Sequence, residues 1–335
     1  MKKKLVSNLY VLIAFIAFWS CKKQETPAIV TPVTPVVTVP KPFIANPNPN
    51  WKVGDRFFLK GNPGDFDGVS VKDPSIVFSD GKWHLFYTGK DSSKWRMGYA
   101  TAPTIAELKT AKRTYLSALN GGSYFCAPQV FYHSTKRTWF LIYQSSLGAT
   151  YSTNTDINNP NGWSSGTAMG FTDGIDFWCI SDDTKVYCFY SAQNGTRYIR
   201  SRFTKKEDFP FKWSEPVVTA TETFEACHIY KNKTDSNYYM MVEDINRHFE
   251  LWQTSNLGGT WAKASEKWAA KSNLTESGEH WTDQVSHGEI IRSGVNERCE
   301  IDDINKCEVL IQGVVSGNYP NYGLIPYDLG LIKNY

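Results

Sequence analysis

The sequence predicts an all-β chain folded as a five-bladed β-propeller. Aromatic residues make up 15% of the 335 residues, and aromatic-rich, turn-rich sequences are typical of β proteins. Five segments share one pattern, in which a short apolar strand, opened by a polar residue in four of the five, is followed by a turn and an aromatic-rich strand. One short stretch, Thr104 to Lys112, has a helical pattern.

The five segments begin at regular intervals. Their starts are separated by 54, 49, 49 and 62 residues, and they lie at Asp73, Ala127, Asp176, Glu225 and His287. The turns inside the segments carry Asp, Gly, Ser and Thr, the residues that favour hairpins. A period near 50 residues built from hairpins is the sequence pattern of a propeller, whose blades take about 40–50 residues each.

The N-terminal residues 1–20 have the pattern of a lipoprotein-type signal peptide. Three lysines at Lys2–Lys4 precede an unbroken apolar run from Leu9 to Phe18, and Ser20 and Cys21 follow at once. A cysteine in this place, after a small residue, resembles a bacterial lipobox. We expect acylation of Cys21 and attachment to a membrane through the lipid alone. Ordinary signal cleavage beside an incidental cysteine is the alternative.

Residues 21–50 read as a lipid-anchored, proline-rich linker, because seven prolines exclude a helix or a central strand. Residues 51–335 remain for one catalytic propeller domain. Without the three N-terminal lysines the formal net charge falls from +3 to zero, which argues against a nucleic-acid partner. We expect an exported monomer, either anchored at the cell surface or in the periplasm, or extracellular.

Six cysteines follow Cys21, as is common in exported proteins. Cys299 and Cys307 flank a short polar loop between two expected strands, which makes them the first candidates for a disulfide. Cys179 and Cys188 flank a hairpin and are the second pair. The sequence has no C-x-x-C motif, so a zinc knuckle is not expected.

Ionisable residues open four of the five repeats. The innermost strand of each propeller blade lines the central channel, so Asp73, Asp176, Glu225 and His287 are expected to converge at its mouth. Unpaired buried charges are costly, so such a convergence favours a reaction or a metal site over a role in stability. Any one of these residues alone could merely begin a strand, and their shared register is what favours a site.

Eight motifs follow one another along about residues 65–335. They are Lys72-Asp73-Pro74-Ser75, Ala127-Pro128 with Phe131-Tyr132, Trp139 to Gln144, Asn159 to Trp163, Ile175-Asp176, Phe224-Glu225-Ala226, Ser286-His287-Gly288-Glu289 with Ile291-Arg292, and Tyr322 to Tyr327. In this order they resemble glycoside hydrolase family 62, the α-L-arabinofuranosidases that remove arabinose from arabinoxylan.

The resemblance implies a five-bladed propeller and a role for each matched residue. Asp73 would be the general base, Glu225 the general acid, and Asp176 the residue that orients the acid and tunes its pKa. His287 would support a calcium ion, mainly through water. Contacts to the bound arabinose would come from Lys72, Gln144, Arg247 and Tyr322.

The chemistry of glycoside hydrolysis requires these residue types. One carboxylic acid protonates the leaving oxygen, and one carboxylate activates water. The acid must stay protonated near neutral pH, and we expect the charge of Asp176 and a dry pocket lined by Trp178, Phe177 and Phe224 to achieve this. Lys72 would keep Asp73 ionised. Inversion of the anomeric centre follows from the resemblance alone.

Two alternatives stay open at this point. One is a family 43-like xylosidase or arabinanase, which is also a five-bladed propeller with three carboxylates. The other is a surface glycan-binding lipoprotein without catalysis, which would have no reason to keep both Asp73 and Glu225. The expected polysaccharide substrate is arabinoxylan or arabinan, and the sequence does not choose between them.

Overall fold

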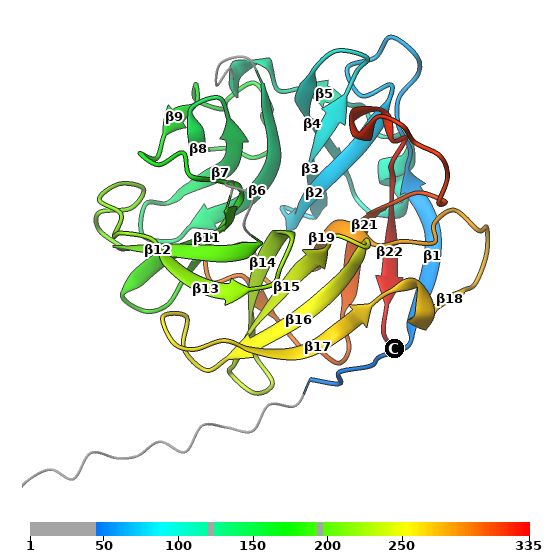
Figure 1. Cartoon of the computed structure of the whole chain (residues 1–335). Helices are drawn as coiled ribbons and strands as arrows, with labels where there is room; N and C mark the ends of the chain where they lie inside the picture. The colour runs from blue at the N-terminus through cyan, green and yellow to red at the C-terminus, as the bar shows by residue number, and fades with distance from the viewer. Residues whose placement is uncertain (1–44, 120–123, 193–196) are drawn as a thin grey trace, which may run out of the picture. The chain divides into compact units, whose positions relative to one another are not determined.

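The computed structural model describes residues 45–119, 124–192 and 197–335. In these residues five β-sheets surround a common centre, and no α-helix occurs (Figure 1). The prediction of a five-bladed β-propeller is therefore confirmed. The expected signal peptide, Cys21 and most of the expected linker lie outside the described residues. None of the described helices is long and apolar enough to cross a membrane.

Each of the first three blades is a four-stranded antiparallel sheet that runs from the centre outward in chain order. Blade 1 consists of β2 (Ser70–Ser79), β3 (Lys82–Lys90), β4 (Trp95–Ala102) and β5 (Thr114–Tyr115). Blade 2 consists of β6 (Phe125–His133), β7 (Thr138–Ser145), β8 (Gly148–Asn154) and β9 (Thr167–Ala168). Blade 3 consists of β10 (Gly174–Ser181), β11 (Lys185–Ala192), β12 (Tyr198–Lys205) and β13 (Val217–Thr221).

The last two blades each gain a fifth strand. Blade 4 consists of β14 (Glu225–Asn232), β15 (Tyr238–Asp244), β16 (His248–Thr254) and β17 (Ala262–Ala269), and the short β20 (Glu300–Ile301) pairs with the inner edge of β14. Blade 5 consists of β19 (Ser286–Ile290), β21 (Glu308–Gly313), β22 (Asp328–Lys333), β1 (Trp51–Phe58) and β18 (Leu274–Glu276).

The ring of blades closes by pairing the two ends of the domain. The first strand, β1, pairs antiparallel with the last strand, β22, inside blade 5. The end of the expected linker also contacts the domain: Asn273 donates its side-chain amide to the carbonyl of Pro49 at 3.0 Å, and Asn305 accepts from the backbone of Asn46 at 2.6 Å. The last residues of the linker are therefore held against the propeller.

Short 3-10 helices fill the connections, and one of them lies in the stretch that has a helical pattern in the sequence. They are η1 (Ala106–Thr110), η2 (Ser117–Leu119), η3 (Lys271–Asn273) and η4 (Tyr322–Leu324).

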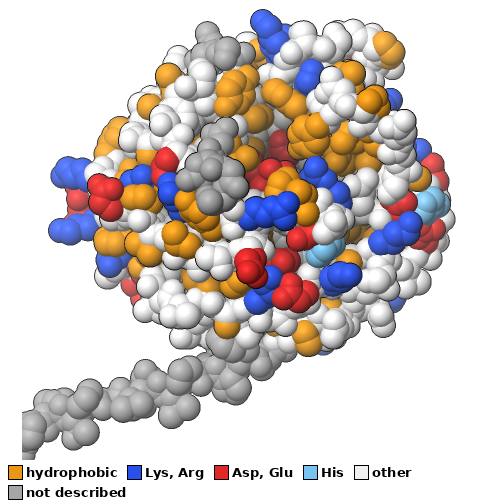
Figure 2. All heavy atoms as spheres, viewed as in Figure 1, with side chains coloured by type: hydrophobic (Ala, Val, Ile, Leu, Met, Phe, Trp, Pro, Cys, Tyr) orange, Lys and Arg blue, Asp and Glu red, His pale blue; other side chains and the backbone are white. Residues whose placement is uncertain are grey.

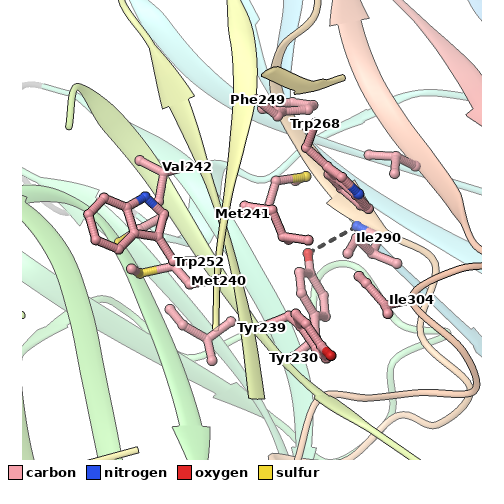
Figure 3. Close-up of a cluster of buried hydrophobic side chains, with 14 of the residues drawn as sticks. Tyr230, Tyr239, Met240, Met241, Val242, Phe249, Trp252, Trp268, Ile290 and Ile304 are labelled. Atoms are coloured by element: carbon pink, nitrogen blue, oxygen red, sulfur yellow. Dashed lines mark hydrogen bonds between the residues drawn. The ribbon is translucent and has the colours of Figure 1, made fainter. Parts of the chain in front are cut away.

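Large apolar side chains fill the space between neighbouring blades. Figure 3 shows this packing in blade 4, where Met241, Phe249 and Trp268 lie close to Ile290 of blade 5. The Tyr230 hydroxyl accepts a hydrogen bond from the backbone of Ile290 at 3.0 Å, so the polar end of this buried ring is satisfied as well. This rigid packing fixes the inner strands that carry the site.

The loop between β19 and β21 crosses the far end of the central channel. Its carbonyls at Val295, Glu297 and Cys299 accept hydrogen bonds from the ends of the inner strands β6, β10 and β14. Arg292 is buried there, bound to Glu289 at 2.7 Å and to the carbonyl of Val130 at 2.8 Å. The channel is thus closed at one end, and the site lies at the other.

Neither of the two candidate disulfides is formed, and the course of this loop explains the absence of the first, between Cys299 and Cys307. All six described cysteines are free. Cys299 lies on the channel floor with its Sγ 3.6 Å from the carbonyl of Cys179, whereas the Cys307 Sγ donates to the carbonyl of Ile304. Cys179 and Cys188 are direct cross-strand neighbours, and burial raises the pKa of the Cys188 thiol well above its usual value.

Candidate active site

A pocket of about 400 Å³ opens at the mouth of the central channel. Figure 2 shows acidic side chains at the bottom of a hollow in the middle of one face of the molecule. The pocket is lined by Lys72, Asp73, Trp95, Tyr124, Cys126, Gln144, Ile175, Asp176, Glu225, His287 and Tyr322. The structure therefore brings together the four repeat starts that were expected to converge and three of the expected arabinose contacts.

A bulge at the same place in every inner strand aims these side chains. In each of the five blades the innermost strand has one residue more at this point than the strand with which it pairs. Asp73, Ala127, Asp176 and Ala226 have left-handed backbone angles at this point, with φ between 46° and 56°. Such a conformation costs about 1–3 kcal/mol for a non-glycine residue and is concentrated at functional sites.

The bulges also correct the alignment of the repeats. The residue of blade 4 that corresponds to Asp73 and Asp176 is Ala226, so Glu225 occupies the preceding position, which is that of Lys72 in blade 1. Glu225 and Asp73 consequently enter the pocket from different positions of the bulge. The expectation that all the repeat starts share one register is wrong by one residue in blade 4.

A ring of hydrogen bonds between blades holds the bulges in place. The second-strand residue opposite each bulge reaches the next blade, where its side chain accepts from a backbone N–H at the bulge. Thr88 accepts from Ala127 at 2.8 Å, Gln144 from Asp176 at 3.4 Å, Glu243 from His287 at 2.8 Å, and Gln312 from Asp73 at 2.9 Å. In blade 3 this place belongs to Ser191, whose buried hydroxyl has no partner among the described residues.

Asp73 lies in a cationic environment. Burial alone would raise its pKa, but Lys72, with its Nζ 4.0 Å from the carboxylate, and His287, with its Nδ1 at 3.2 Å, lower the pKa below its ordinary value. This carboxyl is therefore ionised at neutral pH. A carboxylate in this state can accept a proton from water.

Glu225 lies in the opposite environment. Burial and the nearby carboxylate of Glu243 raise the pKa of its carboxyl to about 7, against the opposite effect of Lys72 and Arg247. Arg247 is the closest cation, with Nη1 at 3.7 Å from the Glu225 carboxylate. Near neutral pH this group holds a proton that it can donate.

Asp176 completes the set of carboxyl groups. Burial and the charge of Glu225 raise its pKa well above the ordinary value. Its backbone is held by Gln144, whose side chain also donates to the Tyr124 hydroxyl at 3.2 Å. Three carboxyl groups in one pocket thus have different proton affinities.

Aromatic residues form the rim of the pocket. Lys72 donates to the Tyr322 hydroxyl at 2.8 Å, and its Nζ lies 4.8 Å from the centre of the Trp95 ring. Tyr322 is 45% exposed, so part of its side chain is open to solvent at the rim. Trp95 and Tyr124 were not found from the sequence. Trp95 is the first residue of β4, and Tyr124 directly precedes β6.

Arg247 lies beside the pocket rather than in its lining. Its guanidinium is held by the carboxylate of Glu243 and lies 5.5 Å from the ring centres of Phe224 and Tyr322. A second hollow of about 600 Å³ begins at Arg247 and is lined by polar side chains that include His248, Lys267 and Gln284.

The expected position of Trp178 in the pocket is wrong. Its side chain is 1% exposed and packs between blades 3 and 4, stacked on His228 with ring centres 4.1 Å apart. Its Nε1 donates to the carbonyl of Ile229 at 2.9 Å. Because the bulge at Asp176 changes the alternation of the strand, Trp178 turns to the core, and Phe177 is buried in the core with it.

The surroundings of His287 do not form a protein cage for calcium. Calcium takes six to eight oxygen ligands. Among the described residues no group of three or more His, Cys, Asp or Glu side chains could hold a metal ion. The Nδ1 of His287 faces Asp73 instead. A calcium ion held mainly by water stays a prediction, and no step below depends on it.

The chain matches the model of glycosyl hydrolase family 62 over residues 64–333, which include the whole pocket. The chain belongs to glycoside hydrolase family 62. This assignment confirms the resemblance found in the sequence. It also excludes family 43 as the family of this chain.

Relatives with known names agree with this assignment. The chain is 32% identical over 311 residues to alpha-L-arabinofuranosidase C of Cellvibrio japonicus, and the match covers 87% of the chain and 46% of that protein. The chain thus spans about half the length of the curated relative it matches.

Solved structures of the family also resemble the chain. The catalytic domain of the family 62 alpha-L-arabinofuranosidase from Coprinopsis cinerea is 28% identical, with a TM-score of 0.80 and coverage of 85% of this chain and 97% of that one. The Podospora anserina alpha-L-arabinofuranosidase, solved with cellotriose, is 29% identical, with a TM-score of 0.79 and coverage of 86% and 98%.

Proposed function

We propose that the protein is an exported, lipid-anchored α-L-arabinofuranosidase that removes arabinofuranosyl side chains from arabinoxylan with inversion. One observation carries the proposal: a single pocket holds a carboxyl with a lowered pKa, Asp73, and a carboxyl with a pKa of about 7, Glu225. A glycan-binding protein without catalysis would need neither. The arabinofuranosidases of the same family support the choice of sugar.

In the proposed reaction each carboxyl performs one proton transfer. Glu225 donates its proton to the xylose oxygen that leaves the arabinose, while Asp73 removes a proton from the attacking water. The bond between the arabinose C1 and the leaving oxygen breaks as the bond between C1 and water forms. Arabinose is released with a hydroxyl in place of the xylose oxygen, and its anomeric configuration is inverted.

The other pocket residues bind and orient the sugar. Lys72 and Tyr322, which are joined by a hydrogen bond of 2.8 Å, present polar atoms to the sugar hydroxyls, and Gln144 does so from blade 2. Asp176 is positioned to orient Glu225 or to accept a hydrogen bond from the sugar. Lys72 has a second effect, because its charge keeps Asp73 ionised.

The second hollow, beside Arg247, supports the proposal that the substrate is a polymer. A pocket of about 400 Å³ suits one pentose, and the neighbouring hollow at Arg247 gives space for the sugars of a chain to which that pentose is attached. The exposed ring of Tyr322 stands beside the pocket, where it can stack on a sugar face. A branched xylan has this shape.

Product analysis tests the proposal. The protein is incubated separately with arabinoxylan, with linear arabinan and with unbranched xylo-oligosaccharides, and the released sugars are separated by chromatography. We expect free arabinose from arabinoxylan, no shortening of xylo-oligosaccharides, and a β-configured first product in proton NMR spectra. Release of xylose alone, or of no sugar from any of the three, would contradict it.

A further inference from the structure

Glu243 is a fully buried carboxyl directly behind the catalytic pocket. Its side chain is 0% exposed and lies on β15, where it is the cross-strand partner of Glu225. One oxygen accepts from Ser286 Oγ at 2.7 Å and from Arg247, and the other accepts from the backbone of His287 at 2.8 Å. The expectations drawn from the sequence assign it no role.

The same position in the other four blades carries a neutral side chain. These residues, each opposite the bulge of its own blade, are Thr88, Gln144, Ser191 and Gln312. Gln144 and Gln312 accept the same inter-blade hydrogen bond that Glu243 accepts. A glutamine is therefore sufficient for the structural role, and the charge of Glu243 needs a different explanation.

The charge acts on two neighbours. Arg247 lies between Glu243 and Glu225, in contact with the first and with its Nη1 3.7 Å from the second. By binding the guanidinium, Glu243 keeps it from forming a close ion pair with Glu225. The negative charge of Glu243 also disfavours a second negative charge on its cross-strand partner.

We propose that Glu243 is a positioning residue for the reaction, whose buried negative charge keeps Glu225 in its protonated form and holds Arg247 at the edge of the sugar pocket. The inference rests on the proposed acid–base function. It gives to Glu243 the tuning role that the sequence assigns to Asp176. Burial and Glu243 are the two main causes that raise the pKa of Glu225, which agrees with this geometry.

Other charged or titratable groups near Glu225 and Glu243 also influence the pKa of Glu225. Those that face Glu225 or Glu243 are Lys72 and Asp73 of β2, Asp176 of β10, Arg247 of the β15–β16 turn, His287 of β19, and the hydroxyls of Tyr322 and Tyr327. Of the cations, Arg247 is the one that Glu243 binds directly. Removing the charge of Glu243 therefore leaves Arg247 to act on Glu225.

The test is the pH profile of the variant Glu243→Gln. The amide can keep the bond to His287 but carries no charge, so Glu225 should lose its proton at lower pH. With an arabinosylated xylo-oligosaccharide, whose xylose oxygen needs protonation to leave, we expect the alkaline limb of kcat/KM to move down by about one pH unit. With 4-nitrophenyl α-L-arabinofuranoside, which needs little acid, the rate at high pH should change much less.

Three variants serve as controls. Glu250→Gln removes another buried carboxylate of blade 4, which is bound to Lys263 at 2.9 Å, and should leave the limb in place. Glu243→Asp keeps the charge and should keep the limb near its wild-type position even if the rate falls. Asp176→Asn should move the limb less than Glu243→Gln does.

A measurement without substrate separates this inference from the proposed function. The stability gained by Glu225→Gln is compared across pH in the presence and absence of Glu243→Gln. The pH above which this gain stops rising should also fall by about one unit. If neither this pH nor the alkaline limb changes, or if the rate falls equally at every pH, the inference is overturned. If Glu243→Gln does not fold, the test uses Glu243→Asp, which keeps the charge. A shift of its alkaline limb by a full pH unit would then overturn the inference.

Discussion

Glu225→Gln should inactivate the protein on its polymer substrate and yet make it more stable above neutral pH. The Glu225 carboxyl is largely buried, and its pKa is about 7 in the folded chain against an ordinary value of 4.5. An ionised carboxylate at this place therefore costs folding free energy. Glutamine has nearly the same shape and never ionises, so the variant avoids this cost.

The sign and size of the effect follow from the two pKa values. Below pH 4.5 the carboxyl is protonated in both the folded and the unfolded chain, and its ionisation has no influence. Between pH 4.5 and about 7 only the unfolded chain gains by ionising, so the wild-type protein loses stability as pH rises. The full difference corresponds to about 3 kcal/mol, at about 1.4 kcal/mol for each pH unit between the two values.

Thermal unfolding of both proteins at pH 5 and pH 8 measures the effect. About 3 kcal/mol corresponds to about 6 °C in Tm for a domain of this size. We expect the variant to exceed wild type by about 6 °C more at pH 8 than at pH 5. The reasoning is refuted if the difference in Tm is the same at both pH values, because a changed contact without a changed ionisation would act equally at each.

Three further predictions concern the ring of hydrogen bonds between blades, the expected calcium ion and the expected lipid anchor. Gln312→Ala leaves the buried N–H of Asp73 without its acceptor and should lower the free energy of unfolding by about 1–3 kcal/mol in denaturant titrations. Ser191→Ala should be nearly neutral, because the Ser191 hydroxyl makes no such bond to any described residue. Equal losses in the two variants would contradict the stabilising role of the hydrogen bonds between blades. Chelation of calcium should lower Tm by a few degrees at most without unfolding the chain, and complete loss of activity restored by calcium would disprove this. Cys21→Ala should move the protein from the membrane fraction to the soluble fraction, and unchanged detergent partitioning would exclude the lipid anchor.

The propeller could be predicted because its signal repeats. Each blade needs an apolar inner strand and a tight hairpin, and this requirement recurs about every 50 residues in the chain. The residues at the channel mouth could be predicted for the same reason, since Asp73 and Asp176 stand at equivalent places in their blades. Glu225 was also found, although the predicted repeat starts one residue too early in blade 4. There the bulge position belongs to Ala226, and Glu225 precedes it.

The failures come from geometry that no local pattern shows. A bulge reverses the alternation of side chains, so Trp178 turns from the expected pocket to the core. The loop that holds Cys299 crosses the channel floor to three other blades, and such long-range pairing leaves no periodic signal. Glu243 stands in an ordinary aromatic-rich strand, and its closeness to Glu225 depends on the strand register.

The most direct test of the account compares two substrates in two variants, Glu225→Gln and Asp73→Asn. On arabinoxylan both variants should release almost no arabinose, because one cannot protonate the leaving xylose oxygen and the other cannot deprotonate water. On 4-nitrophenyl α-L-arabinofuranoside the phenolate leaves without a proton, so Glu225→Gln should keep much of its rate while Asp73→Asn stays inactive. Near wild-type cleavage of arabinoxylan by Glu225→Gln, or recovery of Asp73→Asn but not of Glu225→Gln on the aryl substrate, would contradict the assignment of acid and base.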